Sequence, residues 1–589
     1  MQIQPTTEAK LSTGNMTLVV LCDTRQPEYT HMKETVFSAL EHFGMPYGLV
    51  DLARTRLSNV DLGQHAAVVI GQEHLGTTLH PSDTHALVRA VQEGLGLVSL
   101  DHNVFAYPEA FSEALALERG RPSNHPAEVG ADGLIIADNG HFVAGTQNTG
   151  STHEFKMPVP ASLSRVRSGN TAVLAETTEG YPCVIAARIG QGRTIQWLIS
   201  PKVWMRQYFG HAYGLDDLLW KGIVWVARKP FVMNAMPPFV RLRLDDCNGL
   251  WRDASDFRFV DVLNEFGHKP TLCLCMRAIS DDGAGKIKQL HADSLAEFAP
   301  HTLSPNTGIF YGDERGEYSY HELQVLMEEV DSLFARWGIR PSRILSDHGH
   351  SYSSKVLPLL KERGISFKMN ITLPDEKWTG PHVDWRPKPY GSMSYAFDYL
   401  PGGRDLFVVF NHHSVFDYAR AYLPDGRYLY NRGGGFGKYK WDFLNGLTTG
   451  NEDQGPNDID AAAERLATHT RLGLDSLFFG GSITHSRFSC KLSEYEWRAL
   501  LLRYEELTSR YEKINVGYDF IAEYARSKFE THIARVEADR GEDIVRCSMV
   551  GQSSVPLRLY VFEDSDEMVE HRFESIPAFD GRAEVVFGI

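Results

Sequence analysis

Strand-like and helix-like segments alternate along most of this 589-residue chain, and this alternation restricts its fold more than any other feature. Near the start, short β-branched apolar runs at residues 17–21 and 66–70 are separated by a helical pattern at residues 30–43. Such alternation predicts a parallel sheet with helices on its faces. We therefore expect an α/β open-sheet domain over residues 16–235.

The alternation resumes after the prolines at positions 230, 237 and 238, which predict a domain boundary near residue 235. Repeated strand and helix patterns over residues 236–528 predict a barrel-like α/β domain whose site lies at the C-terminal ends of its strands. Short alternating strands then return and predict a small β domain over residues 529–589. A chain of this length can give each of three domains its own core.

Charge and cysteine content narrow the function classes. With 75 acidic against 59 basic side chains, the net charge is −16, which argues against nucleic-acid binding. No apolar run approaches the roughly 18 residues of a membrane span, and the N-terminus lacks a cationic secretion signal. The seven cysteines are scattered and odd in number. We expect a reduced, cytoplasmic protein, with a homo-oligomer left open.

Two adjacent carboxylates, Asp245 and Asp246, end the first predicted strand of the second domain. Alternate residues of a strand share a face, so Arg243 and Asp245 are expected to face the barrel interior together. Adjacent carboxylates suit a division of labour, in which one binds a divalent metal while the other takes a proton from water. The alternative is structural, with Asp246 capping a turn after the strand.

Histidines follow several other predicted strands of this domain. They are His301, His348, His350, His412, His413 and His485. A single histidine at such a place is more often structural than functional. The ends of barrel strands converge on one mouth, however, so these side chains are expected to gather there. One carboxylate and two imidazoles with open positions are a common arrangement for a divalent metal.

The order of these motifs resembles the polysaccharide deacetylase (NodB-homology) superfamily over residues 236–528. Arg-Leu-Arg-Leu-Asp-Asp at 241–246 is similar to its first motif. Phe-Ala-Pro-His-Thr-Leu-Ser at 298–304 lies where its histidine motif is expected, and Gly-Gly-Ser-Ile-Thr-His at 480–485 is similar to its last motif. The resemblance implies a distorted (β/α) barrel of NodB type that removes N-acetyl groups with a bound metal.

The resemblance also implies roles for individual residues. Asp245 would be the catalytic base, Asp246 a metal ligand, and His485 the acid that protonates the departing nitrogen. The chain departs from the family pattern at position 305, which is proline where a second histidine is expected. It departs again at residues 346–350, where Ser-Asp-His-Gly-His replaces an Arg-x-Pro-Tyr loop.

These departures imply a modified site. Its expected metal ligands are Asp246, His301 and His348, with His350 as the alternative to His348. Arg243 is expected to replace the missing arginine, because a cation on the same strand face would orient Asp245 and lower its pKa. Tyr390, in a faint echo of the missing loop, and the pair His412 and His413 are expected to contact substrate.

The function expected from these residues is hydrolysis of C–N (amide) bonds, with zinc as the preferred divalent metal and metal-bound water as the nucleophile. Deacetylation of an N-acetylated carbohydrate or related molecule is the leading hypothesis. Two alternatives stay open. One is a non-carbohydrate amidohydrolase for cyclic amides, of the allantoinase type, and the other is a glycan-binding pseudoenzyme, which Pro305 favours.

The N-terminal domain resembles glutamine-amidotransferase-like α/β domains, in which a cysteine occupies a sharp turn after a strand. The corresponding segment here, residues 97–102, contains no cysteine, and Cys22 follows a different strand. We therefore expect this domain to be non-catalytic and to shape a substrate entrance or an oligomer contact.

Overall fold

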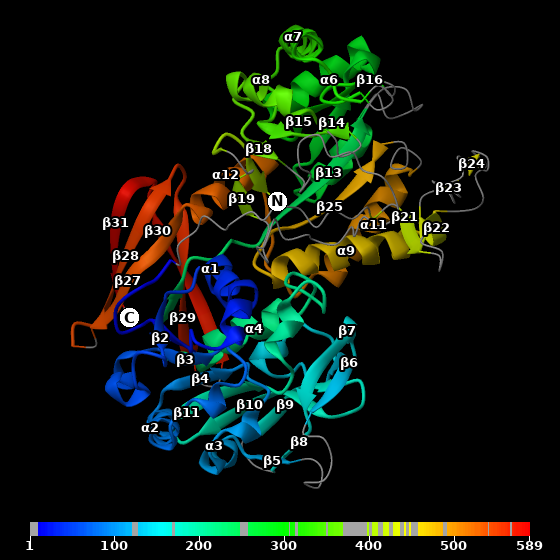
Figure 1. The fold of residues 1–589 in the computed structure, drawn as a ribbon. Coiled ribbons are helices and arrows are strands. Elements are labelled where there is room, and N and C mark those ends of the chain that lie inside the picture. Colours follow the sequence, from blue (N-terminus) through cyan, green and yellow to red (C-terminus); the bar gives the residue numbers. More distant parts are fainter. Residues whose placement is uncertain are drawn as a thin grey trace.

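The computed structural model is a mixed α/β protein with a β-rich C-terminal region (Figure 1). It describes residues 10–119, 128–167, 171–247, 257–304, 307–312, 316–348, 352–368, 397–399, 403–409, 416, 418–422, 428–435, 441–442, 447–448, 457–486, 492–539, 541–565 and 568–588. Within these ranges, no helix combines the length and the apolar character that crossing a membrane requires.

A nine-stranded mixed sheet forms the N-terminal part, in the order β2-β1-β3-β4-β11-β10-β9-β6-β7. Its strands are β1 (Leu18–Cys22), β2 (Tyr47–Asp51), β3 (Ala67–Ile70), β4 (Gly96–Ser99), β6 (Glu128–Ile136), β7 (Thr152–Ser162), β9 (Thr171–Thr177), β10 (Pro182–Ile189) and β11 (Gly192–Trp197). The first five strands in this order pair in parallel and the others antiparallel. The parallel strands β1, β3 and β4 are buried throughout, which explains their continuous apolar sequences.

Helices accompany this sheet, and a small ribbon lies apart from it. The helices are α1 (Ser38–Phe43), α2 (Pro81–Gln92), α3 (Glu109–Ala114) and α4 (Asp216–Val226), and the ribbon pairs β5 (Leu117–Arg119) with β8 (Ser164–Val166). Helix α2 begins with proline at its first turn, where the missing N–H has no helical partner to lose. The expected open sheet is thus present, extended by antiparallel strands.

The second region, from β13 to α12, contains two further sheets, and each of them includes parallel strand pairs. One has the order β16-β15-β14-β13-β25 with β26 beside β13, and the other has the order β17-β18-β20-β19. The strands are β13 (Phe239–Cys247), β14 (Thr271–Cys275), β15 (Glu297–Ser304), β16 (Thr307–Gly308), β17 (Ile344–Leu345), β18 (Phe367–Lys368), β19 (Phe397–Tyr399), β20 (Phe407–Val409), β25 (Gly480–His485) and β26 (Ile514–Asn515).

The expected barrel is not closed in the described part of the chain. Among the described residues, β15 pairs with β14 and β16, while β17 pairs with β18, and no ladder joins β15 to β17. The Ser342 amide, shortly before β17, donates a hydrogen bond to the Phe298 carbonyl of β15, and the Phe416 amide donates one to the Ile483 carbonyl of β25. The described strands of this region therefore form two sheets, and the Ser342 hydrogen bond brings the segment that contains β17 beside β15.

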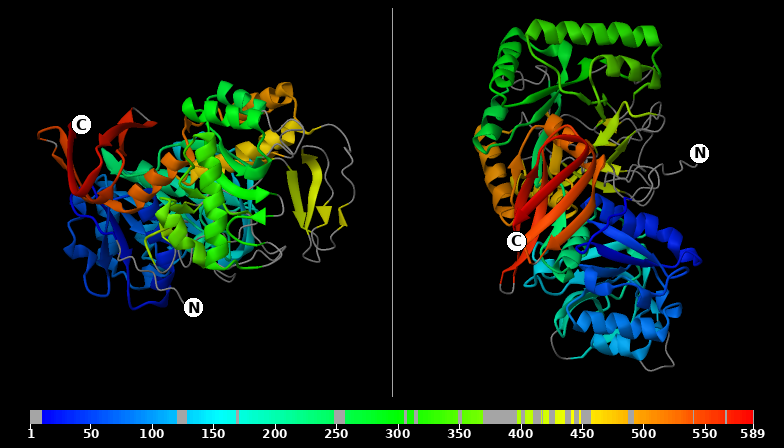
Figure 2. Two further views of the ribbon diagram at one scale, coloured as in Figure 1. Left: turned by 90° about the horizontal axis from the view of Figure 1, so that it is seen from above. Right: turned by 90° about the vertical axis from the view of Figure 1, so that its left-hand side faces the viewer.

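The helices of this region are α5 (Arg258–Glu265), α6 (Asp281–Ala292), α7 (Tyr320–Trp337), α8 (Leu357–Glu362), α9 (Ile459–Asp475), α11 (Glu494–Leu507) and α12 (Tyr518–Phe529). Helices α7 and α11 each begin with a capping box, in which a serine and a glutamate three residues later satisfy each other's main-chain amides. A separate antiparallel sheet contains β21 (Tyr418–Tyr422), β22 (Tyr428–Gly435), β23 (Trp441–Asp442) and β24 (Leu447–Thr448). Figure 2 shows it at the opposite end of the molecule from the C-terminal strands.

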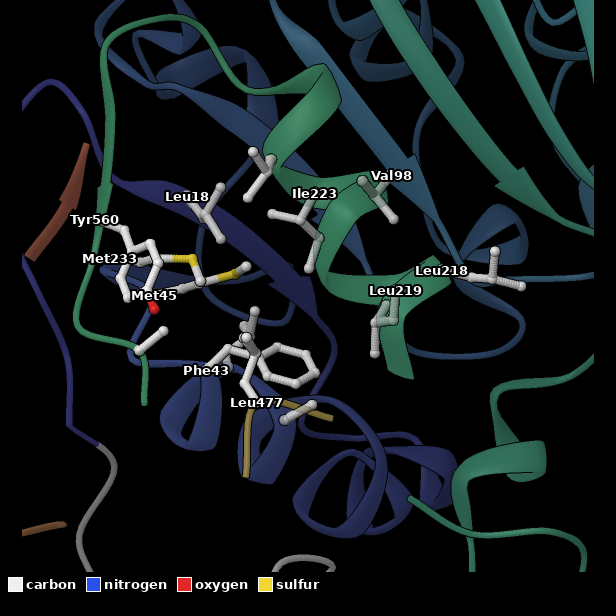
Figure 3. Packing of buried hydrophobic residues seen from close by; sticks show 14 of the residues in the cluster. Leu18, Phe43, Met45, Val98, Leu218, Leu219, Ile223, Met233, Leu477 and Tyr560 are labelled. Atoms are coloured by element: carbon white, nitrogen blue, oxygen red, sulfur yellow. The ribbon is translucent and has the colours of Figure 1, made fainter. Parts of the chain in front are cut away.

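The C-terminal strands are integrated into the molecule. They are β27 (Thr531–Asp539), β28 (Ile544–Ser553), β29 (Leu557–Ser565), β30 (Met568–Ile576) and β31 (Phe579–Gly588). Strand β12 (Phe231–Met233), which precedes the second region, pairs with β29. Figure 3 shows Leu18, Phe43, Leu477 and Tyr560 packed together, so residues from all three regions share one hydrophobic core.

Candidate metal centre

Asp245 and Asp246 lie in a β-bulge at the end of β13. The ladder to β14 aligns Leu244 with Leu272 but Cys247 with Leu274, so β13 contains one extra residue. Asp246 has a positive φ of 56°, a conformation uncommon outside glycine that requires support from its surroundings. Adjacent side chains of a regular strand point to opposite faces, whereas the bulge re-aims one of them.

The two carboxylates consequently approach the same imidazole. The Nε2 atom of His301 lies 3.9 Å from Oδ2 of Asp245 and 3.6 Å from Oδ1 of Asp246. The hydroxyl of Ser486 donates a 2.6 Å hydrogen bond to the main-chain carbonyl of Asp246, which holds the bulge from the neighbouring strand end. The division of labour expected for the two carboxylates is therefore geometrically available.

The three expected metal ligands converge. Asp246, His301 and His348 each offer one ligand atom, and these atoms all lie within 4.8 Å of one another. His348 follows β17, and its Nε2 atom is 3.9 Å from Oδ1 of Asp246, while its ring meets that of His301 edge to face at 5.2 Å. One carboxylate and two imidazoles fit zinc and other divalent cations of its kind. Side chains from β13, β15 and the segment after β17 thus form a donor set of the expected composition, although His301 lies inside β15 rather than after the strand as expected.

Ser346 orients His301. The Nδ1 atom of His301 is 2.9 Å from the main-chain carbonyl oxygen of Ser346 and 3.1 Å from its hydroxyl. A carbonyl can only accept, so Nδ1 carries the proton and Nε2, on the carboxylate side, keeps its lone pair. Burial lowers the pKa of His301, against the opposing effect of Asp245. The ring is therefore in the neutral form that binds metals.

Arg243 and Asp245 form a buried bidentate ion pair, with Nε to Oδ1 at 2.5 Å and Nη2 to Oδ2 at 2.8 Å. Only 1% of Arg243 and 6% of Asp245 is exposed. Burial alone would raise the pKa of Asp245, but Arg243, followed by His301 and His485, holds it well below the usual range. Asp245 is therefore ionised throughout the physiological range.

His485 lies beside Asp245. It is the last residue of β25, and the parallel ladder between β13 and β25 pairs it directly with Asp245. Residues paired in this way point to the same face of a sheet. The residue expected to act as acid is thus next to the residue expected to act as base, on the side where the metal ligands converge.

The sequence did not single out the buried pair formed by Asp347 and Lys368. Their Oδ1 and Nζ atoms are 2.5 Å apart, and both side chains are fully buried. This pair secures the segment between Ser346 and His348. Lys368 lies on β18, and no local pattern could have linked it to residue 347.

Four expected site residues cannot be placed. His350, Tyr390, His412 and His413 lie outside the described residues. The alternative of His350 as metal ligand and the substrate contacts of the other three remain predictions.

The N-terminal sheet carries no reactive thiol among its described residues. Cys22 and Cys183 are its cysteines, and both are buried. Burial, reinforced by Asp51 and Asp23, raises the pKa of Cys22 to about 12. In the segment at β4, where the expected cysteine is missing, Asp101 accepts a hydrogen bond of 2.9 Å from the Tyr107 hydroxyl. The non-catalytic role expected for this domain stays a prediction.

Comparison with known proteins gives only distant likenesses. No family model and no curated protein matches the chain. A candidate polysaccharide deacetylase from Mycobacterium smegmatis is 14% identical, covers 50% of this chain and 92% of its own, and has a TM-score of 0.32. A candidate glycoside hydrolase/deacetylase from Parabacteroides distasonis is 9% identical, covers 59% and 87%, and has a TM-score of 0.30.

An exo-beta-1,4-mannosidase from an Opitutaceae bacterium is 15% identical over 36% of each chain, with a TM-score of 0.24. The chain therefore spans about a third of that enzyme's length. TM-scores this low do not identify a shared fold, so none of the three proteins defines the function of this chain.

Proposed function

We propose that this protein is a metal-dependent hydrolase of C–N (amide) bonds. The observation that carries the proposal is the convergence of Asp246, His301 and His348 beside the ion pair of Arg243 and Asp245. Deacetylation of an N-acetylated carbohydrate or a related small molecule is the reaction we favour. That choice of substrate rests on the order of the sequence motifs.

Asp246, His301 and His348 would hold the cation, with zinc as the first choice. When bound, a divalent cation supplies a Lewis acid that polarises the amide carbonyl and makes water more acidic. These ligands come from β13, β15 and the segment after β17, so the packing of these three segments would determine where the cation is held.

Asp245 would accept the proton that water loses when it attacks the carbonyl. Arg243 keeps this carboxylate ionised and holds both of its oxygens in place. His485, in its protonated form, would donate a proton to the departing nitrogen as the C–N bond breaks. Asp245 thus takes up one proton from water and His485 gives up one proton to the nitrogen. The products are a carboxylic acid and an amine.

Metal analysis tests the site. Purified protein is expected to contain about one divalent metal per chain, as a single site of this donor set would bind, and His301→Ala is expected to lose it. His268→Ala is the matched control, because His268 is also a buried histidine of the same region, 1% exposed, but lies outside the ligand group. Metal-free wild-type protein with full activity would rule out the proposal.

Product analysis tests the reaction. Acetate release from N-acetyl sugars, abolished in His301→Ala, is the expected result. A metal-containing protein that instead opens cyclic amides would be an amidohydrolase of the allantoinase type. A protein without metal or product that still binds glycans would be a pseudoenzyme.

A further inference from the structure

Ser346 contacts residues of β13 and β15, two strands that are separated by β14 in their sheet. It follows β17 and is 1% exposed. Its carbonyl and hydroxyl oxygens both lie within hydrogen-bond distance of His301 on β15, and its hydroxyl also accepts a 3.2 Å hydrogen bond from Nη2 of Arg243 on β13. Two positions later the same segment supplies His348. One residue therefore links the three segments that supply the expected metal ligands.

The carbonyl and the hydroxyl have different effects. The carbonyl requires a proton on Nδ1 of His301, which leaves Nε2 free to bind a cation. The hydroxyl oxygen has two lone pairs, so it can accept from Arg243 and from His301 at once. It thereby links the ligand His301 to the guanidinium that holds the carboxylate of Asp245.

The segment that carries Ser346 is held firmly. Asp347, the next residue, forms the buried ion pair with Lys368 of the adjacent strand. The Lys368 ammonium also lies 5.4 Å from the centre of the Tyr352 ring. The Ser346 backbone therefore has a fixed position against which His301 can be oriented.

We propose that Ser346 is the positioning residue of this site: its carbonyl selects the His301 tautomer that can bind metal, and its hydroxyl couples the metal-ligand group to the Arg243–Asp245 pair. The part concerning metal affinity rests on the proposed function, whereas the part concerning the His301 tautomer does not.

The tautomer can be measured in metal-free wild-type protein labelled with ¹⁵N-histidine. The ring nitrogens of His301 are assigned by comparison with His301→Gln. We expect Nδ1 to show the chemical shift of a protonated nitrogen and Nε2 that of an unprotonated one. The reverse pattern would overturn the proposal, and this result does not depend on whether a metal binds.

The coupling can be measured by titrating full-length protein with Co²⁺ and following its visible absorption. We expect Ser346→Ala to weaken Co²⁺ binding about tenfold, as loss of partners behind a metal ligand typically does, and to change the absorption spectrum. Ser346→Thr, which keeps a hydroxyl, is expected to restore both. Ser342→Ala removes another buried serine hydroxyl from the same segment, one that donates to Asp519, and is expected to leave both unchanged.

The outcomes separate the two proposals. Wild-type protein that does not bind Co²⁺ would contradict the proposed function, and the tautomer measurement would still decide the role of the carbonyl. Wild-type binding with an unaltered Ser346→Ala titration, or with equal losses in Ser342→Ala, would overturn the role of the hydroxyl alone. Failure of Ser346→Thr to restore Co²⁺ binding would also overturn the role of the Ser346 hydroxyl.

Discussion

The guanidinium of Arg243 forms two hydrogen bonds with the carboxylate of Asp245, two residues farther along the same strand. Both side chains are buried, so each charge depends on the other for its stabilisation. The pair keeps Asp245 ionised and directs it toward His301 and His485. Local strand geometry thus supplies both the charge and the orientation of the proposed base.

Removing Arg243 should therefore destabilise the fold. Arg243→Met leaves a buried carboxylate without its partner and is expected to lower the free energy of unfolding by about 3–5 kcal/mol. The double variant Arg243→Met with Asp245→Asn should recover part of this loss, since no buried charge remains. Urea denaturation of the two single variants and the double variant measures the coupling, and strictly additive losses would contradict it.

Asp245 and Asp246 should be separable by mutation despite being adjacent. Asp245→Asn is expected to keep the metal and to lower kcat about 100-fold or more, the usual effect of losing a general base. Asp246→Asn is expected to lose the metal, and asparagine tolerates the positive φ at this position. Metal content and amide hydrolysis, measured on the same samples, distinguish the roles. The opposite pattern would exchange them.

His485 should matter only for poor leaving groups. His485→Gln is expected to lower amide hydrolysis about 100-fold or more while the metal content stays unchanged. Hydrolysis of an aryl acetate should fall much less, because a phenolate leaves without being protonated. Equal losses on both substrates would assign His485 to binding rather than to proton donation.

Asp475 should make the fold less stable as pH rises. Burial, followed by the charge of Asp217, raises its pKa to about 7. An acid with a raised pKa contributes stability below its unfolded pKa and loses that contribution as pH rises through the folded value. Asp475→Asn should accordingly gain about 1–3 kcal/mol relative to wild type between pH 4 and pH 8. Denaturant unfolding at both pH values measures this difference, and a pH-independent difference would contradict it.

Glycine should be required at position 44, where the N-terminal region contacts Asn234 in the segment that precedes β13. Gly44 has φ of 70°, and an added Cβ would lie 2.0 Å from the Asn234 carbonyl oxygen. Gly44→Ala is expected to destabilise the protein by about 3 kcal/mol or more, since a steric clash adds to the left-handed penalty. Gly150→Ala is the control, because Gly150 also has positive φ but an open surrounding, and should lose about 1 kcal/mol. Calorimetry compares the two, and equal effects would contradict the clash.

Part of the site was accessible from local sequence. Asp245, Asp246, His301 and His348 each follow or end a predicted strand, and the metal ligands do converge, although the structure places His301 inside β15. Within the described residues the strands of the expected barrel-like domain lie in two sheets, with no ladder between β15 and β17. The C-terminal strands were expected as a separate domain, yet β12 pairs with β29 across the chain.

The sequence by itself determined the alternation of strands and helices and the carboxylates and histidines available for chemistry, because buried strands and polar strand ends leave patterns within a few residues. Only the tertiary structure decided how these groups face one another. The bulge at Asp246, the contact of Ser346 with His301 and the pairing of Asp347 with Lys368 each join separate strands. Such contacts depend on how the strands pack and leave no local pattern.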